Sequence, residues 1–411
     1  MNPILSALMR NKTGAVLVAI QVAISMAILA NALHIVNLRQ AVMARPSGIA
    51  DESSVFYVST RYLTRETAEY DRALQLRETA RLRAIPGVAS VATTNQMPLS
   101  NQARRSSVSV DRKQLNESAG AWIYQTGDSL VATWQLKLVA GRDFKPDDVL
   151  ELDSQASHNG TPKTVIVTSA LAAKLWPGPG SAVGKTLFFG VGDDAEESEV
   201  IGVVERLQSP GAQIDEQGDF SLIQPFRGVG GIPGATYTVR TAPGERDRVM
   251  KEAEAALHKD ATAPVILSAK TTESDRKQRY RADMALSWTL IAVSALLLVI
   301  TASGIVGMAS LWVTQRRKQI GVRRALGARR ADILRYFITE NIMITAAGVA
   351  SGAVLAIGLN QLLVTKLEMA KLPLGYLLAG TGVFFALGVI AVYGPAWRAA
   401  SISPALATRS A

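Results

Sequence analysis

The sequence predicts a membrane protein with four transmembrane α-helices and a large α+β extracytoplasmic domain inserted between the first and second helices. One observation is a set of four almost continuously apolar runs in the 411-residue chain. Another is the long stretch of strand-like and helix-like segments between the first two runs. Each run reaches or exceeds the ~20 residues that a helix needs to cross a bilayer core of about 30 Å. The predicted spans are 13–35, 284–313, 333–364 and 374–397.

The distribution of charge orients these spans. The chain carries a net charge of +10, yet residues 36–283 hold 30 Lys/Arg against 31 Asp/Glu, so the basic excess lies beside the spans. This is the positive-inside pattern of membrane proteins and not a nucleic-acid-binding surface. Residues 314–335 hold eight basic residues and a single acid, Asp332. This region is therefore predicted to be cytoplasmic.

Placing that loop in the cytoplasm fixes the remaining topology. Both termini are then expected inside and the large domain outside, which gives cytoplasmic segments 1–12, 314–332 and 398–411 and external segments 36–283 and 365–373. The tripeptide Ala30-Asn31-Ala32 offers an alternative, which is cleavage by signal peptidase. The apolar run before it is longer than the roughly 7–15 residues of a signal peptide. A retained first helix is expected, and N-terminal sequencing of the mature protein distinguishes the two.

Residues 36–283 are predicted to form two small α+β subdomains. The run SSVFYVST within Asp51–Thr60 is rich in β-branched and aromatic residues and predicts a strand. Thr64–Ile85 predicts a surface helix, and Val88–Thr94 predicts a second strand. This order is typical of a helix packed on one face of a sheet. The chain has no cysteine, so disulfides and thiolate metal sites are excluded and the domain depends on its hydrophobic core.

No catalytic, cofactor-binding or metal site is predicted in this chain. The segment GPGSAVGKT ends like a phosphate-binding loop. The position five residues before Gly184 should be glycine, but it is Pro179, which has no N–H to donate to a phosphate. A turn leading into a strand is predicted there instead. The three histidines stand far apart, and neither an HExxH nor a GxSxG motif occurs. Any ATP that serves this protein is therefore expected to bind to another chain.

The third span carries the small and ionisable residues with the clearest predicted roles. Gly348 and Gly352 form a GxxxG motif, which lets helix backbones approach closely in a membrane. Glu340 lies near the predicted cytoplasmic end of the span, and we expect it to pair with Arg335 or with another arginine of the loop. A positional role is favoured over a functional one at this depth, although a membrane acid is by default a functional candidate. The spans show too few ionisable residues for a typical secondary transporter or channel.

The segment IGVRRALGA, Ile320–Ala328, carries the most informative signal in the chain. Apolar and small residues alternate with arginines, which predicts a short amphipathic helix at the membrane surface. A topology signal alone needs only basic residues, whereas an ordered face of small residues suits insertion into a groove of a partner. The residues assigned to this docking role are Ile320, Gly321, Val322, Arg323, Arg324, Ala325, Leu326, Gly327 and Ala328.

This segment resembles the pattern E-R-x-x-E-I-G-[IV]-R-[RM]-A-[LV]-G-A of the MacB–FtsX permeases of ABC transporters, the type VII or mechanotransmission class. Ser129–Phe144, Thr164–Leu187 and the tail Gly394–Arg409 are similar to segments that occur in the same order in that family. The arrangement of one helix, a large external domain and three further helices is also that of the family. The resemblance therefore extends over nearly the whole chain.

The resemblance implies a permease subunit in the bacterial inner membrane with a MacB-like periplasmic core domain. In this family, separate or fused cytoplasmic ATPases bind ATP and Mg²⁺, and their movements reach the periplasmic domain to drive export of a drug, peptide or toxin. It further implies a second permease, identical or different, contact with membrane lipid, and in some members a periplasmic adaptor and an outer-membrane channel. By this analogy Arg323 and Arg324 pair with acids of an ATPase, while Ile320 and Leu326 fill an apolar cleft.

Three alternatives stay open at this point. The same machinery could extract lipoproteins, or it could regulate an envelope hydrolase without transport. A membrane-anchored sensor is a third possibility, and it predicts no co-purifying ATPase. The sequence also departs from the family pattern, with Gln315 and Gln319 in place of acids and Ser403 in place of Asp. Such changes suit the less typical member of a heterodimeric pair, or weaker coupling to an ATPase.

Overall fold

The computed structural model describes residues 12–401, except for short gaps, and divides the chain into two compact units. We call residues 1–40 with 283–411 the helical unit, and residues 41–282 the α+β unit. The start of the predicted N-terminal segment and the tail with Ser403 lie outside the described residues. The gaps within the described range are 101–103, 115, 154–159, 191, 193–194, 212–215, 231–233, 262 and 368–369.

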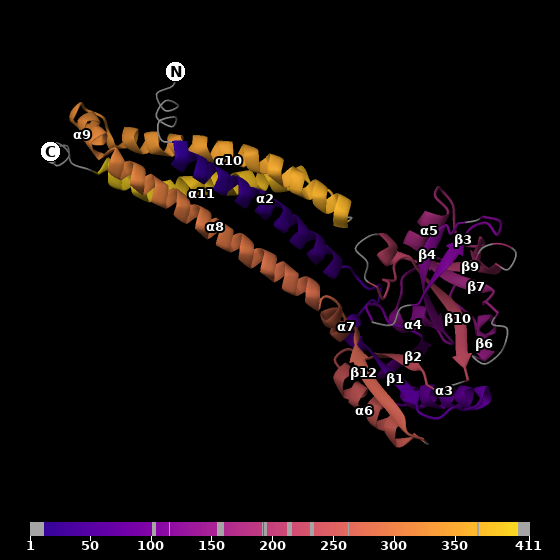
Figure 1. Cartoon of the computed structure of the whole chain (residues 1–411). Helices are drawn as coiled ribbons and strands as arrows, with labels where there is room; N and C mark the ends of the chain where they lie inside the picture. Colours follow the sequence, from indigo (N-terminus) through magenta and orange to yellow (C-terminus); the bar gives the residue numbers. More distant parts are fainter. Residues whose placement is uncertain are drawn as a thin grey trace. The chain divides into compact units, whose positions relative to one another are not determined.

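Within the described residues, four helices of the helical unit are long and apolar enough to cross a membrane (Figure 1). They are α2 (Lys12–Met43), α8 (Arg281–Gln315), α10 (Arg330–Leu367) and α11 (Leu374–Ala400). This confirms the predicted fold class. All four helices extend beyond the predicted spans at one end or both. Hydropathy marks only the part suited to hydrocarbon, whereas the backbone hydrogen bonds of a helix continue into polar residues at its ends.

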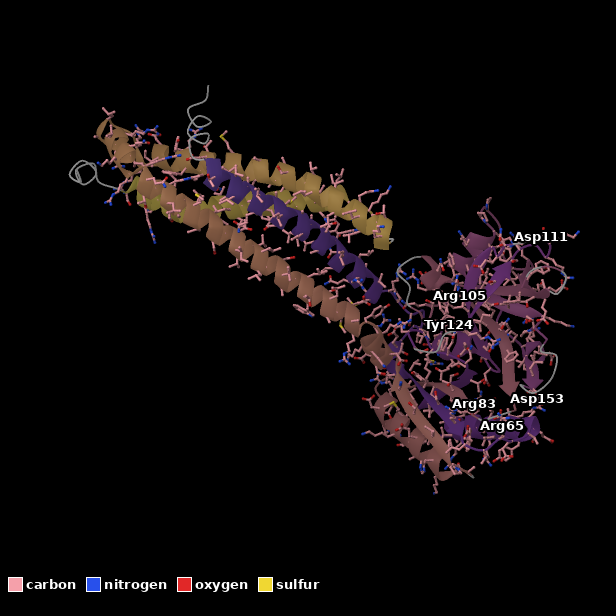
Figure 2. The ribbon with its side chains drawn as sticks, in the orientation of Figure 1. Arg65, Arg83, Arg105, Asp111, Tyr124 and Asp153 are labelled. Carbon is pink, nitrogen blue, oxygen red and sulfur yellow. The ribbon has the colours of Figure 1, made fainter. Side chains whose placement is uncertain are left out.

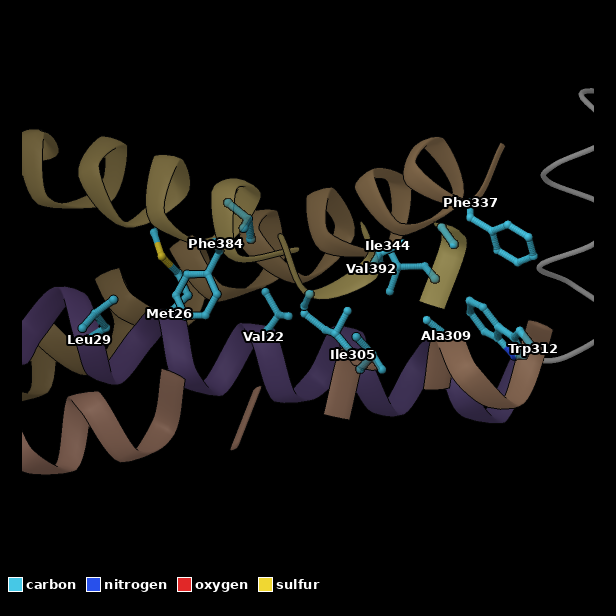
Figure 3. Close-up of a cluster of buried hydrophobic side chains, with 14 of the residues drawn as sticks. Val22, Met26, Leu29, Ile305, Ala309, Trp312, Phe337, Ile344, Phe384 and Val392 are labelled. Carbon is cyan, nitrogen blue, oxygen red and sulfur yellow. The ribbon is translucent and has the colours of Figure 1, made fainter. Parts of the chain in front are cut away.

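A continuous apolar core joins the helices of this unit. Val22 and Met26 of α2 are fully buried, as is Phe384 of α11, and all three belong to one cluster with Ile305 of α8 and Ile344 of α10 (Figure 3). Because lipid is as apolar as these side chains, close packing and not the hydrophobic effect holds such helices together.

Two predicted packing glycines meet helix α2 directly. A Cβ atom on Gly348 would lie 2.8 Å from the carbonyl oxygen of Ala19, and one on Gly352 would lie 2.9 Å from the carbonyl oxygen of Ala23. A backbone oxygen cannot move aside as a flexible side chain can. The absence of a side chain at these two positions therefore sets the close approach of α10 to α2.

Gly352→Ala is expected to lower the thermal unfolding temperature of the protein. Alanine favours a helix by about 0.8–1.0 kcal/mol over glycine, but overpacking against α2 costs about 1–3 kcal/mol. The matched control is Gly358→Ala on the same helix, where a Cβ atom meets nothing within 4 Å. The control should keep or raise the unfolding temperature, measured by circular dichroism in detergent. Equal effects of the two changes would contradict the packing role.

The α+β unit contains two sheets. A four-stranded antiparallel sheet has the order β12-β1-β11-β2, formed by β1 (Val55–Tyr62), β2 (Val88–Thr94), β11 (Thr236–Thr241) and β12 (Val265–Thr271). In the second sheet six strands close on themselves in the order β4-β3-β8-β9-β7-β10, since β10 returns to pair in parallel with β4, while β5 pairs with β9 and β6 with β10. Its strands are β3 (Arg105–Ser109), β4 (Ala119–Thr126), β5 (Leu138–Gly141), β6 (Leu150–Asp153), β7 (Thr164–Thr168), β8 (Thr186–Phe189), β9 (Glu196–Val204) and β10 (Ser221–Val229).

The helices of this unit pack on the sheets around separate apolar cores. Leu82 of a helix and Val249 of another are fully buried with Phe56 of β1 in the core of the four-stranded sheet. Tyr124, labelled in Figure 2, and Trp134 are fully buried in a second core, with their ring centroids 5.7 Å apart. The helices are α3 (Ala68–Arg83), α4 (Leu130–Trp134), α5 (Ser169–Leu175), α6 (Arg246–Lys259) and α7 (Thr272–Arg279).

Helix α3 differs from the surface helix that the sequence predicts, because it buries two of its acids. The Glu78 carboxylate is 5 % exposed and accepts hydrogen bonds from the hydroxyls of Tyr62 and Tyr237, both at 2.6 Å. Asp71 lies on the same buried face of α3, and its carboxylate accepts a hydrogen bond from the backbone N–H of Gly230 at 3.0 Å. Charged residues are usually solvated, and only the fold brings the tyrosines of β1 and β11 to this carboxylate.

These acids predict a dependence of stability on pH. Burial is the largest effect on Glu78 and Asp71 and raises the pKa of each carboxyl above its usual value, although hydrogen bonds oppose it. A raised pKa in the folded state means that the folded protein binds protons more tightly than the unfolded chain. The contribution of this tighter proton binding to the free energy of unfolding is complete below the unfolded pKa. It is lost as the pH rises through the folded pKa.

We therefore expect the unfolding temperature of the α+β unit to fall as the pH rises from the ordinary carboxyl pKa of about 4 through the raised values. The measurement is thermal unfolding of the full chain over that range. Glu78→Gln keeps the shape of the side chain but cannot titrate, so it should flatten the slope. A variant with the unchanged slope would rule out Glu78 as its source.

Candidate functional site

The docking segment forms α9 (Arg317–Ala325), a helix that begins three residues before the predicted segment and ends before its last three residues. Leu326 caps this helix, and Gly327 follows with a φ of +99°. The N–H of Gly327 donates to the carbonyl of Arg324 at 3.2 Å, and that of Ala328 donates to the carbonyl of Arg323 at 3.0 Å. This is the Schellman ending, in which a left-handed glycine satisfies the last carbonyl groups of a helix.

The two large apolar residues that were expected to enter a partner lie on different sides of this segment. Ile320 is only 5 % exposed and packs into the apolar core of the helical unit, together with the buried Gly321. Ile320 therefore anchors α9 to its own chain, and the expectation that its side chain fills a cleft in a partner is wrong for this arrangement. Leu326 is 82 % exposed and Val322 is 51 % exposed. These two residues are the large apolar groups of the segment that a partner can reach.

The paired arginines of the segment make contacts within the chain. The Arg323 guanidinium lies over the ring of Tyr336 in α10, 5.2 Å from its centroid. Arg324 donates from Nη1 to the carbonyl of Ala400 at the end of α11, at 3.3 Å. A cation over an aromatic ring keeps its charge accessible. Both contacts orient α9 on the other helices. Neither contact involves an acidic side chain, so neither neutralises the positive charge of its arginine.

Glu340 forms an ion pair with Arg316, the residue that directly follows α8. Its oxygens lie 2.8 and 3.1 Å from Nη1 of Arg316, and the carboxylate is 1 % exposed. The same Nη1 lies 3.4 Å from the hydroxyl of Tyr336, and the guanidinium lies 5.7 Å from the ring centroid of Trp312. The partner is thus another arginine of the loop and not Arg335. This inner ion pair, Arg316–Glu340, joins the end of α8 to α10 immediately before α9 begins.

The exposed surface of the segment combines apolar and basic groups. Val322, Ala325 and Leu326 are exposed beside basic side chains, which are Arg317, Lys318, Arg323, Arg329 and Arg330. An apolar centre with a charged surround is the usual composition of a protein interface that binds an acidic groove. The arrangement can bind a protein surface, and its residues include no group suited to catalysis.

A set of polar contacts joins the spans and was not predicted from the sequence. The hydroxyls of Ser25 and Thr301 lie 2.9 Å apart, joining α2 to α8. Asn31 donates to the carbonyl of Ala356 in α10 at 3.1 Å. The available signal was the seven-residue spacing of Ser287, Ser294 and Thr301, which lie on the one buried strip of an otherwise exposed α8. A single serine or threonine in an apolar run gives no such signal, because the signal is the regular spacing of several of them along one helix face.

Comparisons with known proteins give two family matches. Residues 15–256 match the MacB-like periplasmic core domain, and residues 291–404 match the FtsX-like permease C-terminal domain. The first match covers more than half of the chain. It includes most of α2 and most of the α+β unit, and the second includes α9, α10, α11 and most of α8.

The similar proteins are longer than this chain. The macrolide export ATP-binding/permease protein MacB of Agrobacterium fabrum is 24 % identical over 339 residues, which are 80 % of this chain and 49 % of that protein. The pyoverdine export ATP-binding/permease protein PvdT of Pseudomonas syringae pv. syringae is 34 % identical over 134 residues, 32 % of this chain and 20 % of that protein. The chain thus spans about half, or less, of the length of the relatives it matches.

Proposed function

The chain belongs to the MacB–FtsX family of ABC-type permeases, and we propose that it couples ATP hydrolysis by a cytoplasmic ATPase to movements of its extracytoplasmic domain. It is a multi-pass membrane protein whose MacB-like domain lies outside the cytoplasm. In this proposal α9 is the surface on which the ATPase acts, ATP and Mg²⁺ bind to the ATPase, and both termini lie in the cytoplasm of a bacterial inner membrane.

The observation that carries this proposal is the exposed apolar tip of α9. Leu326 is 82 % exposed although it follows a helix anchored by Ile320 and closed by Gly327. An isolated exposed leucine has no consequence. The leucine stands at the end of a capped helix, in a segment with exposed basic side chains. Such a residue is preorganised for a groove with apolar walls and acidic rims, since little conformational freedom is lost on docking.

Export of a small molecule or peptide is the function that the relatives favour. Their names assign macrolide export to one and pyoverdine export to another. We infer that this chain belongs to an assembly of the same kind, with a second permease in the membrane and, in a two-membrane cell, a periplasmic adaptor and an outer-membrane channel. The cargo class of drug, peptide or toxin is inferred from the family resemblance and from these relatives.

The test is co-expression of the permease with a candidate ABC ATPase from the same organism, followed by purification in mild detergent. The expected result is a stable complex whose ATP hydrolysis differs from that of the ATPase alone. Export of a macrolide such as erythromycin by cells that carry the complex then tests the cargo class. A permease that purifies without any ATPase would favour the membrane-anchored sensor, and a complex that hydrolyses ATP without export would favour the regulator.

A further inference from the structure

We propose that Arg39 and Asp283 form the joint through which motion of α8 reaches the two points where the chain passes between its units. This inference rests on the proposed function, because it concerns how an ATP-driven movement would leave the helical unit. The two residues are positioning residues and contact neither ATP nor cargo. The one observation behind the proposal is an ion pair at the only pair of crossings between the units.

The position of the ion pair within the chain is the first argument. The chain leaves the helical unit after Gln40 and returns at Asp283, so both crossings lie within one residue of the pair. The Arg39 Nη1 donates to Oδ1 of Asp283, and the side chains are only 25 % and 29 % exposed. Asp283 stands in the first turn of α8, where the helix dipole favours an acid. We call this contact the outer ion pair.

The side-chain contacts between α2 and α8 follow one another in antiparallel order. Passing inward from the outer ion pair, Ser25 meets Thr301, the Gln21 side chain covers Gly304, and Gly14 faces the Met308 side chain. These contacts pair two hydroxyl groups, or place a flexible side chain over a glycine. Such a seam supplies alignment, but it adds little to the strength of the interface compared with a charged, partly buried pair.

Helix α8 is therefore fastened by an ion pair at each end. The inner ion pair, Arg316–Glu340, joins it to α10 beside α9, and the outer ion pair joins it to α2. A displacement of α9 reaches α8 through the intervening residue Arg316. With the outer ion pair closed, the two crossings move together as one rigid attachment. If the outer ion pair were broken, the two crossings would move independently. The displacement of α8 would then reach only one of them in full.

Cysteine cross-linking tests whether the two residues stay together. The chain has no native cysteine, so Arg39→Cys with Asp283→Cys introduces the only two thiols. A short bismaleimide should link them in high yield in membranes, both without nucleotide and with the complex trapped by ATP, Mg²⁺ and vanadate. The cross-linked complex should keep ATP hydrolysis. The control pair Arg39→Cys with Trp288→Cys, on the exposed side of α8, should cross-link poorly. A yield that falls on nucleotide trapping would overturn the proposal.

Charge reversal tests whether the pair transmits motion. A spin label at the exposed Ser268→Cys reports nucleotide-driven displacement of the α+β unit. Arg39→Asp and Asp283→Arg should each reduce the displaced fraction about tenfold, the size of a typical coupling energy, while the double reversal restores it. A merely structural role would lower the unfolding temperature of the single reversals in parallel with the displaced fraction, whereas a role in transmission leaves that temperature close to the wild-type value. Two reversals whose effects add instead of cancelling would overturn the inference.

The outcomes also separate this inference from the proposed function. A wild-type permease that binds no ATPase would refute the proposed function, and the cross-linking yield without nucleotide would still show whether the outer ion pair exists. A wild-type complex with normal nucleotide-driven displacement, combined with reversal variants that behave like wild type, would refute only the joint.

Discussion

Leu326→Asp is expected to abolish the effect of the permease on its ATPase while leaving the permease folded. The leucine side chain is 82 % exposed, so its replacement removes almost no buried area within the chain. In a complex, a carboxylate at the centre of an apolar groove would be buried without a partner, and losing such an anchor costs about 2–4 kcal/mol, or about 30- to 1000-fold in affinity. The measurement is ATP hydrolysis of the co-purified complex together with the amount of ATPase retained.

The matched control for this prediction is Val139→Asp, a similar change at a 58 % exposed residue of the α+β unit. It should retain the ATPase and its activity. Gly327→Asp is a less specific test, because the φ of +99° at Gly327 disfavours any side chain and the change would also disturb the end of α9. Normal complex formation and export by Leu326→Asp, with wild-type stability, would remove the proposed docking surface.

Glu340→Ala should destabilise the helical unit more than any other single charge change in the spans that we describe. The carboxylate is 1 % exposed and accepts both close contacts from Arg316, which is itself 15 % exposed as a side chain. Removing one member of a buried pair leaves the other charge unpaired, and this costs about 3–5 kcal/mol. The measurement is the thermal unfolding temperature in detergent, and the expected result is a large decrease.

A double variant and an exposed control make this prediction specific. Arg316→Met with Glu340→Met removes both charges and fills the space, so it should be much less destabilising than Glu340→Ala, since replacing a complete buried pair is often close to neutral. Lys318→Met removes a neighbouring exposed charge and should change stability by no more than about 0.5 kcal/mol. If the double variant were as unstable as the single one, the ion pair would not be the source of the effect.

The candidate surface was partly predictable because some of its properties are local. The small-residue pattern of IGVRRALGA indicated a short helix, which the structure contains. The end of this helix before the left-handed Gly327 was not predicted, although a left-handed cap depends only on neighbouring backbone. Local reasoning correctly predicted a turn before a strand at Gly184, which has a φ of +84° and precedes β8. Which face of α9 is covered was not predictable, because it depends on α10 and α11.

The same distinction explains the other differences. The GxxxG motif suggested Gly348 and Gly352 as packing positions, and a Cβ at either would meet the backbone of α2. Glycines of the spans outside this motif include Gly307 and Gly382, where nothing lies within 4 Å of a Cβ. Glu340 needed a basic partner, but several arginines of the loop were available. The acids of α3 carried no signal of burial, because the groups that donate to them are brought together only by the fold. Glu78 accepts from Tyr62 of β1 and from Tyr237 of β11, and Asp71 accepts from the N–H of Gly230.

By itself the sequence determined the class of the protein, four apolar helices with an α+β domain between the first two, because hydropathy over a bilayer thickness and strand or helix periodicity are properties of contiguous residues. Only the tertiary structure decided that Ile320 anchors α9 while Leu326 remains accessible, that Arg316 neutralises Glu340, and that Arg39 meets Asp283. These facts are pairings between distant parts of the chain, and their energy depends on distance and burial, which no stretch of sequence records.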